Sequence, residues 1–302
     1  MTVNRKKKES IHLINSDEKI LEVLEQSNQY LESNDKLSHK IEEILWFFRA
    51  LEDLIPQTVE NVFSGHMFSL IEANSELENS IALCKFGFYK HAFMALRSVV
   101  EMGVLSVYWD VDGKSNLDIQ KWLLSFENTP SRKIVFTKLK DNQNFREYDD
   151  KHKLFDEGDS IFKQLSNFVH TKGHRHSTMD LGNANFNRFN ESSLLKWSEL
   201  MTRVTHFVIV LHILRYPVAL QYTPIEQKFG MNGPAGGFFS PYQMERIKHF
   251  LDIDVIETLQ KISNNDPEAT DMAKWVNEQP DITDEELHIQ AEKFDEMKLT
   301  RD

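Results

Sequence analysis

A charged pair lies within an otherwise apolar stretch of this sequence. Arg97 and Glu101 are four residues apart, a spacing that places two side chains on one face of a helix. A charge that is removed from water must be paired or must serve a site, because an isolated buried charge costs several kcal/mol. One interpretation is an internal salt bridge that fixes the register of the helix. The other is a functional site in which Arg97 binds an anion or polarises a substrate, with Glu101 holding its guanidinium.

A second group of polar residues follows in the segment 165–176. Residues 163–189 carry four basic residues and one acidic residue, Asp180, so this part of an acidic protein is locally basic. The excess of positive charge predicts an anionic ligand such as a small phosphate compound or RNA. On an ideal helix, however, His170 lies away from the apolar stripe of Leu165 and Phe168, so a solvated helix end is the alternative. The predicted ligand-binding residues are Arg97, Glu101, Ser166, His170, Lys172 and Arg175.

The usual signatures of metal and cofactor sites do not occur in the sequence. His170, His174 and His176 are suitable zinc ligands, but no His-Glu-x-x-His or Cys-x-x-Cys motif accompanies them. The glycine-rich segment 229–242 lacks the Gly-Lys-Ser/Thr ending of a phosphate-binding loop, and there is no Gly-x-Ser-x-Gly elbow. We therefore expect no metal and no cofactor. Whether the protein is an enzyme stays open.

Charge and composition restrict the partners and the compartment. The 302 residues carry a net charge of −12, and residues 264–302 alone hold 12 acidic and 4 basic side chains. Binding along a nucleic-acid backbone normally needs a basic protein, so it is disfavoured here outside a local pocket. The basic residues near the amino terminus precede no apolar signal segment, and residues 204–220 are too short and too polar to span a membrane. With one cysteine, Cys84, in an apolar run, we expect a cytoplasmic protein without a membrane span.

Helices must position these residues. Glycine and proline are scarce, with 11 and 8 copies, and apolar residues recur at intervals of three and four. The segment from about 89 to 108 is apolar nearly all round, which is typical of a central helix in a bundle. A longer helical segment is predicted from about Phe145 to His170. Ser240, Asp266 and Thr283 have the sequence context of helix caps.

The predicted fold is all-α, a multi-helix bundle with a central apolar helix and a smaller C-terminal helical extension. We expect a disordered basic leader at 1–15 and a helical bundle at 16–222. Within the bundle, a helix pair occupies 16–55 and a core occupies 66–220. A glycine-rich aromatic loop and acidic helices complete the chain at 223–302.

Two runs of residues resemble a known superfamily. The run from Tyr89 to Glu101, followed by Leu165-Ser-Asn-Phe-Val-His-Thr-Lys, resembles uncharacterised bacterial helical proteins with HEPN-like bundles. The resemblance covers roughly residues 66–220. It implies a group that contains ribonuclease toxins, phage-defence effectors and noncatalytic members, commonly dimeric.

The active ribonucleases of that superfamily carry an arginine followed, after four to six residues, by a histidine. Here the spacing occurs at Arg146 to His152 and at Arg5 to His12, about as often as chance predicts for this composition. Arg146 and His152 lie in an acidic stretch that would repel RNA. The candidate catalytic residues are His170, Arg97, His152 and Arg146.

The leading hypothesis is a noncatalytic or conditionally active helical sensor or interaction module in bacterial stress or phage defence. It would act as a homo-oligomer, expected to be a dimer, or with a protein partner, and it would bind RNA or a small anionic ligand. The first alternative is a metal-independent HEPN-type ribonuclease that uses a histidine as general acid or base. The second alternative is a structural subunit of a complex.

Overall fold

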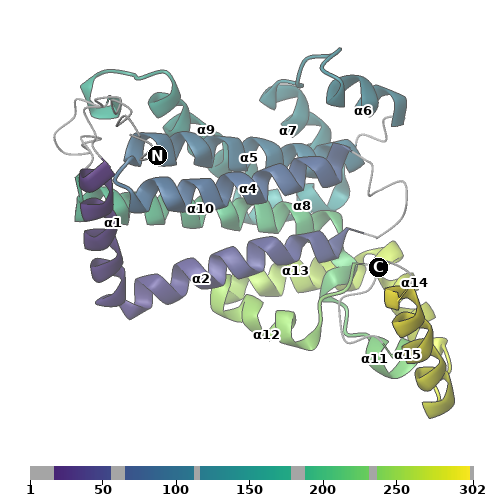
Figure 1. Ribbon diagram of the computed structural model, residues 1–302. Helices are drawn as coiled ribbons and strands as arrows, with labels where there is room; N and C mark the ends of the chain where they lie inside the picture. Colours follow the sequence, from purple (N-terminus) through teal and green to yellow (C-terminus); the bar gives the residue numbers. More distant parts are fainter. Residues whose placement is uncertain (1–16, 56–64, 112–115, 178–187, 231–236, 300–302) are drawn as a thin grey trace, which may run out of the picture.

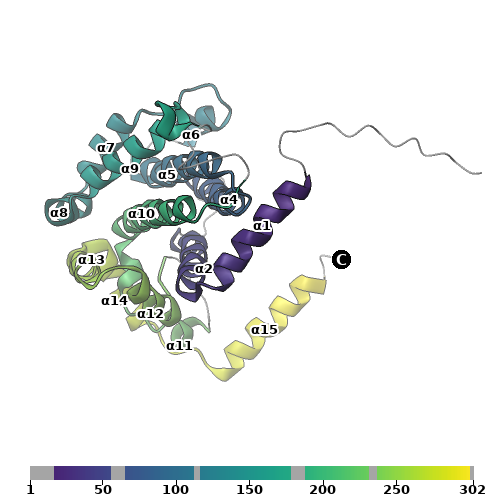
Figure 2. The same cartoon turned by 90° about the vertical axis from the view of Figure 1, so that its left-hand side faces the viewer.

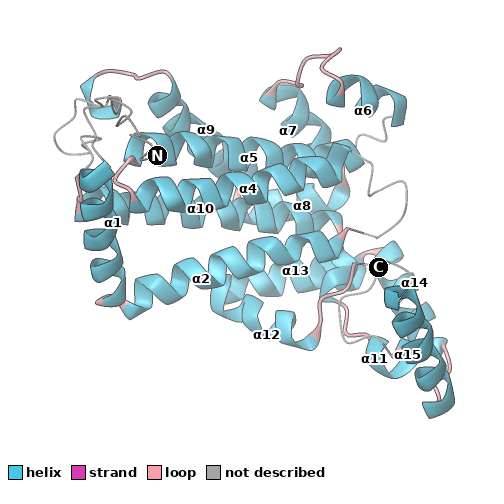
Figure 3. Cartoon of the chain, in the orientation of Figure 1, coloured by secondary structure: helices cyan, strands magenta, loops and turns pink. Residues whose placement is uncertain are grey.

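The computed structural model describes residues 17–55, 65–111, 116–177, 188–230 and 237–299. Within these ranges the chain forms helices and contains no strand (Figure 3), so the all-α prediction is confirmed. The predicted leader at 1–15, and with it Arg5 and His12, lies outside the described residues, as do Asp180 and the middle of the glycine-rich loop.

The helices follow one another along the chain as labelled in Figure 1. The α-helices are α1 (Asp17–Glu32), α2 (Asp35–Arg49), α4 (Gly65–Lys85), α5 (Tyr89–Val111), α6 (Asn116–Leu123), α7 (Arg132–Lys140), α8 (Gln143–His152), α9 (Leu154–Val169), α10 (Glu191–Arg215), α11 (Ile225–Phe229), α12 (Pro241–Phe250), α13 (Ile253–Asn265), α14 (Pro267–Glu278) and α15 (Asp284–Leu299). Short 3₁₀ helices are η1 (Ala50–Leu54), η2 (His174–His176) and η3 (Pro217–Leu220).

The helix α5 is the centre of the bundle, as its all-round apolar sequence predicts. It packs against α4, α9 and α10, and α4, α5 and α10 run side by side in Figure 1. Seen along the bundle in Figure 2, α7, α8 and α9 lie on one side of this group and α2, α12 and α13 on the other, whereas α15 projects away from it. By length and composition, α5 is also the one described helix that could cross a membrane, and it is mostly buried inside the protein.

A glycine allows α5 and α10 to approach closely. A Cβ atom at Gly103 would lie 2.6 Å from Cγ1 of Val208 on α10, closer than real carbon atoms come. Val208 is fully buried and cannot move into solvent. The glycine therefore sets the distance between the two most enclosed helices.

Replacing Gly103 with alanine should destabilise the protein, although alanine favours helices more than glycine does. We expect the free energy of unfolding to fall by about 1–3 kcal/mol, the usual cost of overpacking a core. Urea denaturation followed by circular dichroism measures it. The double variant Gly103→Ala/Val208→Ala should recover part of the loss, and an unchanged or raised stability of the single variant would contradict this packing.

Two histidines are buried, His212 on α10 and His66 at the start of α4, and His206 on α10 is partly buried. His212 is fully buried; its Nδ1 lies 2.8 Å from the carbonyl oxygen of Val208 and its Nε2 lies 3.3 Å from Oγ of Ser106. Burial lowers the pKa of His212 to about 4 and that of His206 to about 4. Burial also lowers the pKa of His66, which is 2 % exposed and whose Nε2 has no hydrogen-bond partner.

Because these pKa values are depressed in the folded state, the unfolded chain binds protons between pH 6.5 and 4 that the folded chain does not. The neutral histidines therefore contribute stability that is present above pH 6.5 and is lost as the pH falls towards 4. His212 alone should lower the free energy of unfolding by about 2 kcal/mol between pH 7 and pH 5.

Urea denaturation at the two pH values measures this loss. The variant His212→Asn should show a smaller difference between pH 7 and pH 5, whereas His174→Gln, at an exposed position, should match the parent. Equal pH dependence in the parent and in His212→Asn would disprove the role of His212.

The predicted segment from Phe145 to His170 is not one helix. Lys153 adopts a left-handed conformation, with φ of 53°, and separates α8 from α9. The amide of Phe155 donates to the carboxylate of Asp149 across this bend, at 3.0 Å. The break turns α9 back along α5 and α10, which both contact it.

Candidate functional site

A pocket opens between α4, α5 and α9. Its volume is about 580 Å³, within the usual range of about 300–1,000 Å³ for small-molecule sites. Four of the six predicted ligand-binding residues line it, from α5, from α9 and from the end of α9. The lining residues are Glu76, Leu83, His91, Met94, Ala95, Arg97, Ser98, Glu101, Ser166, Val169 and His170.

The C-terminal end of α9 is fixed on α5 by one aromatic contact and one hydrogen bond. The rings of Phe93 and Phe168 stack with centroids 4.2 Å apart. Just beyond the helix, Nζ of Lys90 donates to Oγ1 of Thr171 at 2.8 Å. His170 lies between these anchors as the C-cap residue of α9, so its exposed imidazole is held at the pocket by α5.

Arg97 and Glu101 form an ion pair in the wall of the pocket, with Nη1 and Oε1 2.5 Å apart. The Arg97 side chain is 20 % exposed and that of Glu101 is 43 % exposed, so the pair lies at the edge of the core. Cζ of Arg97 lies 4.4 Å from the centre of the Phe162 ring, a cation–π contact. Burial lowers the pKa of Arg97, and the neighbouring carboxylate of Glu101 opposes that shift.

The Arg97 guanidinium is incompletely satisfied. Its buried Nη1 faces the Glu101 carboxylate, and no second acceptor among the described residues is bonded to the guanidinium. A guanidinium has five N–H donors, and a single ion pair leaves several of them unused. A ligand in the pocket can therefore accept hydrogen bonds from Arg97 without displacing a complete network.

Three polar lining residues were not predicted from the sequence. His91 and Ser98 lie on α5 with the spacing His91, Met94, Ser98 and Glu101, which is one stripe along a helix. This periodicity in the sequence could have identified His91 and Ser98 as residues of the site. Glu76 comes from α4, and its approach depends on the pairing of α4 with α5, which the sequence does not specify.

The pocket has mixed charge. Glu76 and Glu101 contribute two negative charges and Arg97 one positive charge, before any histidine binds a proton. Two hydroxyls, from Ser98 and Ser166, add donors and acceptors. The arrangement suits a small polar ligand with both acceptor and donor groups better than it suits a polyanion.

The remaining predicted residues lie elsewhere. Lys172 and Arg175 are exposed in the segment after α9 and do not line this pocket. His152 lines a separate pocket of about 170 Å³, where its Nε2 is 2.9 Å from Oγ1 of Thr258. Arg146 is exposed on α8 and does not line the pocket of His152. The structure thus brings Arg97 and His170 to one pocket and leaves Arg146 and His152 outside it.

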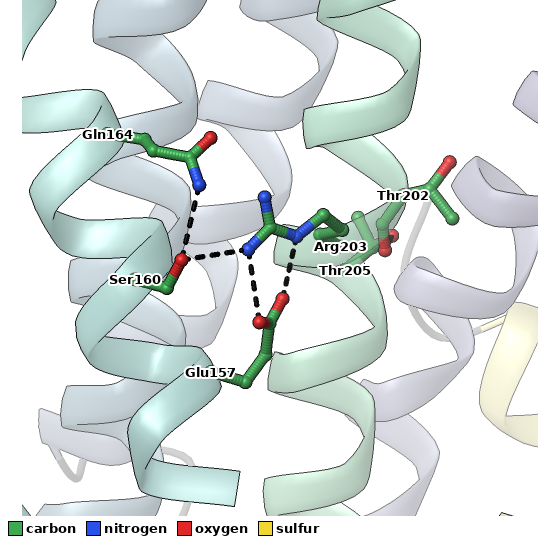
Figure 4. A network of polar contacts seen from close by, with 6 residues as sticks. All are labelled: Glu157, Ser160, Gln164, Thr202, Arg203 and Thr205. Carbon is green, nitrogen blue, oxygen red and sulfur yellow. Dashed lines mark hydrogen bonds and ion pairs between the residues drawn. The ribbon is translucent and has the colours of Figure 1, made fainter.

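A bidentate ion pair joins α9 to α10 (Figure 4). Nε of Arg203 donates to Glu157 at 2.7 Å, and Nη2 donates to the other carboxylate oxygen at 3.0 Å. Nη2 also donates to Oγ of Ser160 at 3.1 Å, on the next turn of α9. This two-point contact holds α9, and therefore the helix that ends in His170, against the body of the protein.

Among the described residues, no three or more His, Cys, Asp and Glu side chains are grouped so that they could hold a metal ion. The histidines 170, 174 and 176 do not converge as a ligand set, because His176 turns back to the carbonyl oxygen of Lys172, 2.9 Å from its Nδ1.

Two double-mutant cycles compare how much the ion pairs of Arg97 and Arg203 contribute to stability. We expect a coupling energy of about 0.3–0.5 kcal/mol for Arg97 and Glu101, measured with Arg97→Met and Glu101→Gln, since the two partly exposed side chains are four residues apart on one helix. Arg203→Met and Glu157→Gln should give about 1 kcal/mol or more, because that pair is bidentate and joins two helices. Urea denaturation measures both, and a larger coupling for Arg97 would mean that its pair is mainly structural.

No family model, no curated protein and no solved structure matches this chain. Its function is therefore inferred from the pocket and the residues that line it.

Proposed function

We propose that the protein is a noncatalytic helical sensor or interaction module, and that its pocket between α4, α5 and α9 binds a small polar ligand with an anionic group. The observation that supports this proposal is the gathering of Arg97, Glu101, Ser166 and His170 around one pocket of ligand size. The anionic group would contact Arg97, and donor groups of the ligand would face Glu76. The setting in bacterial stress or phage defence rests on the resemblance of residues 89–101 and 165–172.

Oligomer formation and a cytoplasmic location belong to the same proposal. A homodimer, or a complex with another protein, would allow ligand binding to be passed on as a change in assembly. The alternative of a structural subunit predicts a partner without any ligand in the pocket.

The second candidate function is a metal-independent ribonuclease. It is favoured by two imidazoles, His91 and His170, in the same pocket as Arg97. One imidazole would take the proton of a 2′-hydroxyl, the other would protonate the leaving 5′-oxygen, and Arg97 would stabilise the charged phosphate. Glu76 and Glu101 argue against it, because two carboxylates beside a phosphodiester raise the cost of binding RNA.

Ligand binding is tested by calorimetry with inorganic phosphate, 5′-nucleoside monophosphates and the matching nucleosides. We expect one of the phosphate compounds to bind and the nucleoside to bind more weakly, since Arg97 contacts the anionic group. Arg97→Ala should weaken binding about tenfold or more, the usual loss for a charge-assisted hydrogen bond. Arg49→Ala is the control, because Arg49 pairs with Glu78 outside the pocket.

The same protein is incubated with labelled total RNA and tRNA, with and without EDTA. The sensor proposal expects intact RNA. EDTA-resistant cleavage that is lost in both His91→Ala and His170→Ala would establish the ribonuclease instead. If no phosphate compound binds and RNA stays intact, the structural-subunit alternative replaces the sensor.

A further inference from the structure

A second pocket, with a different chemistry, lies between the α1–α2 hairpin and the body of the protein. Its volume is about 400 Å³, again within the size range of small-molecule sites. Leu83 and Glu76 on α4 face the pocket of Arg97, whereas Ile81 and Cys84 face this one. The two pockets therefore use different faces of α4, and a ligand of the second pocket does not depend on the function proposed for the first.

The lining of this second pocket is mostly apolar, and the polar side-chain atoms of Trp197 and Ser38 are already bonded. Its apolar lining residues are Leu31, Ile41, Leu45, Ile81, Cys84, Leu194 and Trp197. Nε1 of Trp197 donates to Oγ of Ser80 at 2.9 Å, and Oγ of Ser38 donates to the carbonyl oxygen of Leu31 at 2.6 Å. Burial raises the pKa of the Cys84 thiol, so the sulfur remains a neutral apolar surface. An occupant gains mainly from an apolar body, because Asn28 supplies the one side-chain amide of the lining.

The mouth of the pocket is negatively charged. Glu32, Asp35 and Glu42 line the pocket and are exposed, and Lys85 supplies one positive charge. Within the described residues, none of these three carboxylates forms an ion pair or accepts a hydrogen bond from another side chain. Elsewhere on the same hairpin, Glu43 is paired with Arg246 and Glu22 with Lys19, whereas these three lining carboxylates are unpaired in the part of the chain that the structure describes.

We propose that this pocket binds a small amphiphile that has an alkyl body and a cationic amine head. The alkyl chain would occupy the space between Leu45, Ile81 and Trp197, where it is removed from water. The ammonium would lie among Glu32, Asp35 and Glu42 at the mouth. A fatty acid of the same length would carry its carboxylate into this negative field, so it should bind more weakly.

The test compares decylamine, decanol and decanoate at concentrations at which they are monomeric. Each displaces the fluorescent probe N-phenyl-1-naphthylamine from the full-length protein at pH 7. We expect one site, with decylamine about fivefold tighter than decanol and decanoate weakest, since exposed ion pairs contribute modestly. Equal affinity for decylamine and decanoate would overturn the proposal.

Two kinds of variant locate the site. The triple variant Glu32→Gln/Asp35→Asn/Glu42→Gln should bind decylamine about fivefold more weakly and decanol unchanged. A control triple variant, Glu18→Gln/Glu72→Gln/Asp156→Asn, removes the same charge from exposed positions outside the pocket and should leave both affinities unchanged. Equal loss in the two triple variants would mean that only the net charge attracts the amine.

Ile81→Trp and Leu45→Trp each fill the pocket and should weaken decylamine and decanol alike by about tenfold or more. Both residues are partly exposed, and circular dichroism checks that the variants fold. Undiminished binding in a folded filling variant would place the amphiphile elsewhere. Binding of a basic amphipathic peptide without binding of decylamine would identify the surface as a protein-docking groove and overturn the small-molecule assignment.

Discussion

The largely apolar surface of α5 is the constraint on which the rest of this structure depends. A helix whose polar residues occupy only a short stripe, here His91, Ser98 and Glu101, has no stable position at a surface, so most of it must be enclosed by other helices. The helices α4, α9 and α10 supply the enclosure. The fit is close, since Gly103 leaves no room for even a methyl group beside Val208. Whatever polar chemistry α5 carries is therefore confined to the seams between its neighbours.

The Arg97–Glu101 pair occupies such a seam, and its position explains its incomplete bonding. Between α9 and α10, where the helices meet directly, Arg203 and Glu157 form two hydrogen bonds and recruit Ser160 as well. Arg97 has instead one close carboxylate, an aromatic ring beneath it and an open pocket beside it. The contrast indicates that Arg203 mainly holds helices together, whereas Arg97 keeps donors available.

Much of this architecture could be predicted because it follows from local rules. The caps are examples: Ser240 and Gln243 bond reciprocally, Asp266 accepts from the amide of Ala269, and Thr283 pairs with Glu286. The periodicity of apolar residues indicated the central helix in the same way. The prediction that Arg97, Glu101, Ser166 and His170 belong together combined two such local patterns, and the pocket contains all four.

Other features depend on contacts between distant parts of the chain. Lys153 adopts a left-handed conformation although it is neither glycine nor asparagine, the residues that most often do so. The sequence therefore does not predict the break between α8 and α9. Lys172 and Arg175 are near His170 in sequence, which suggested that they share its site, but they follow the helix end and do not line the pocket. Glu76 enters the site only through the pairing of α4 with α5.

The enclosure of α5 also has a consequence for synthesis of the chain. Only α4 precedes α5 among the helices that pack closely against it, whereas α7, α9 and α10 follow it in the chain. Ribosomes add about 5–20 residues per second, so the uncovered side of α5 waits for many seconds before its last cover exists. In that interval it is a long apolar helix with an incomplete set of partners, and it has the length and composition of a membrane span. Completion of α10 supplies the last of the helices that enclose α5.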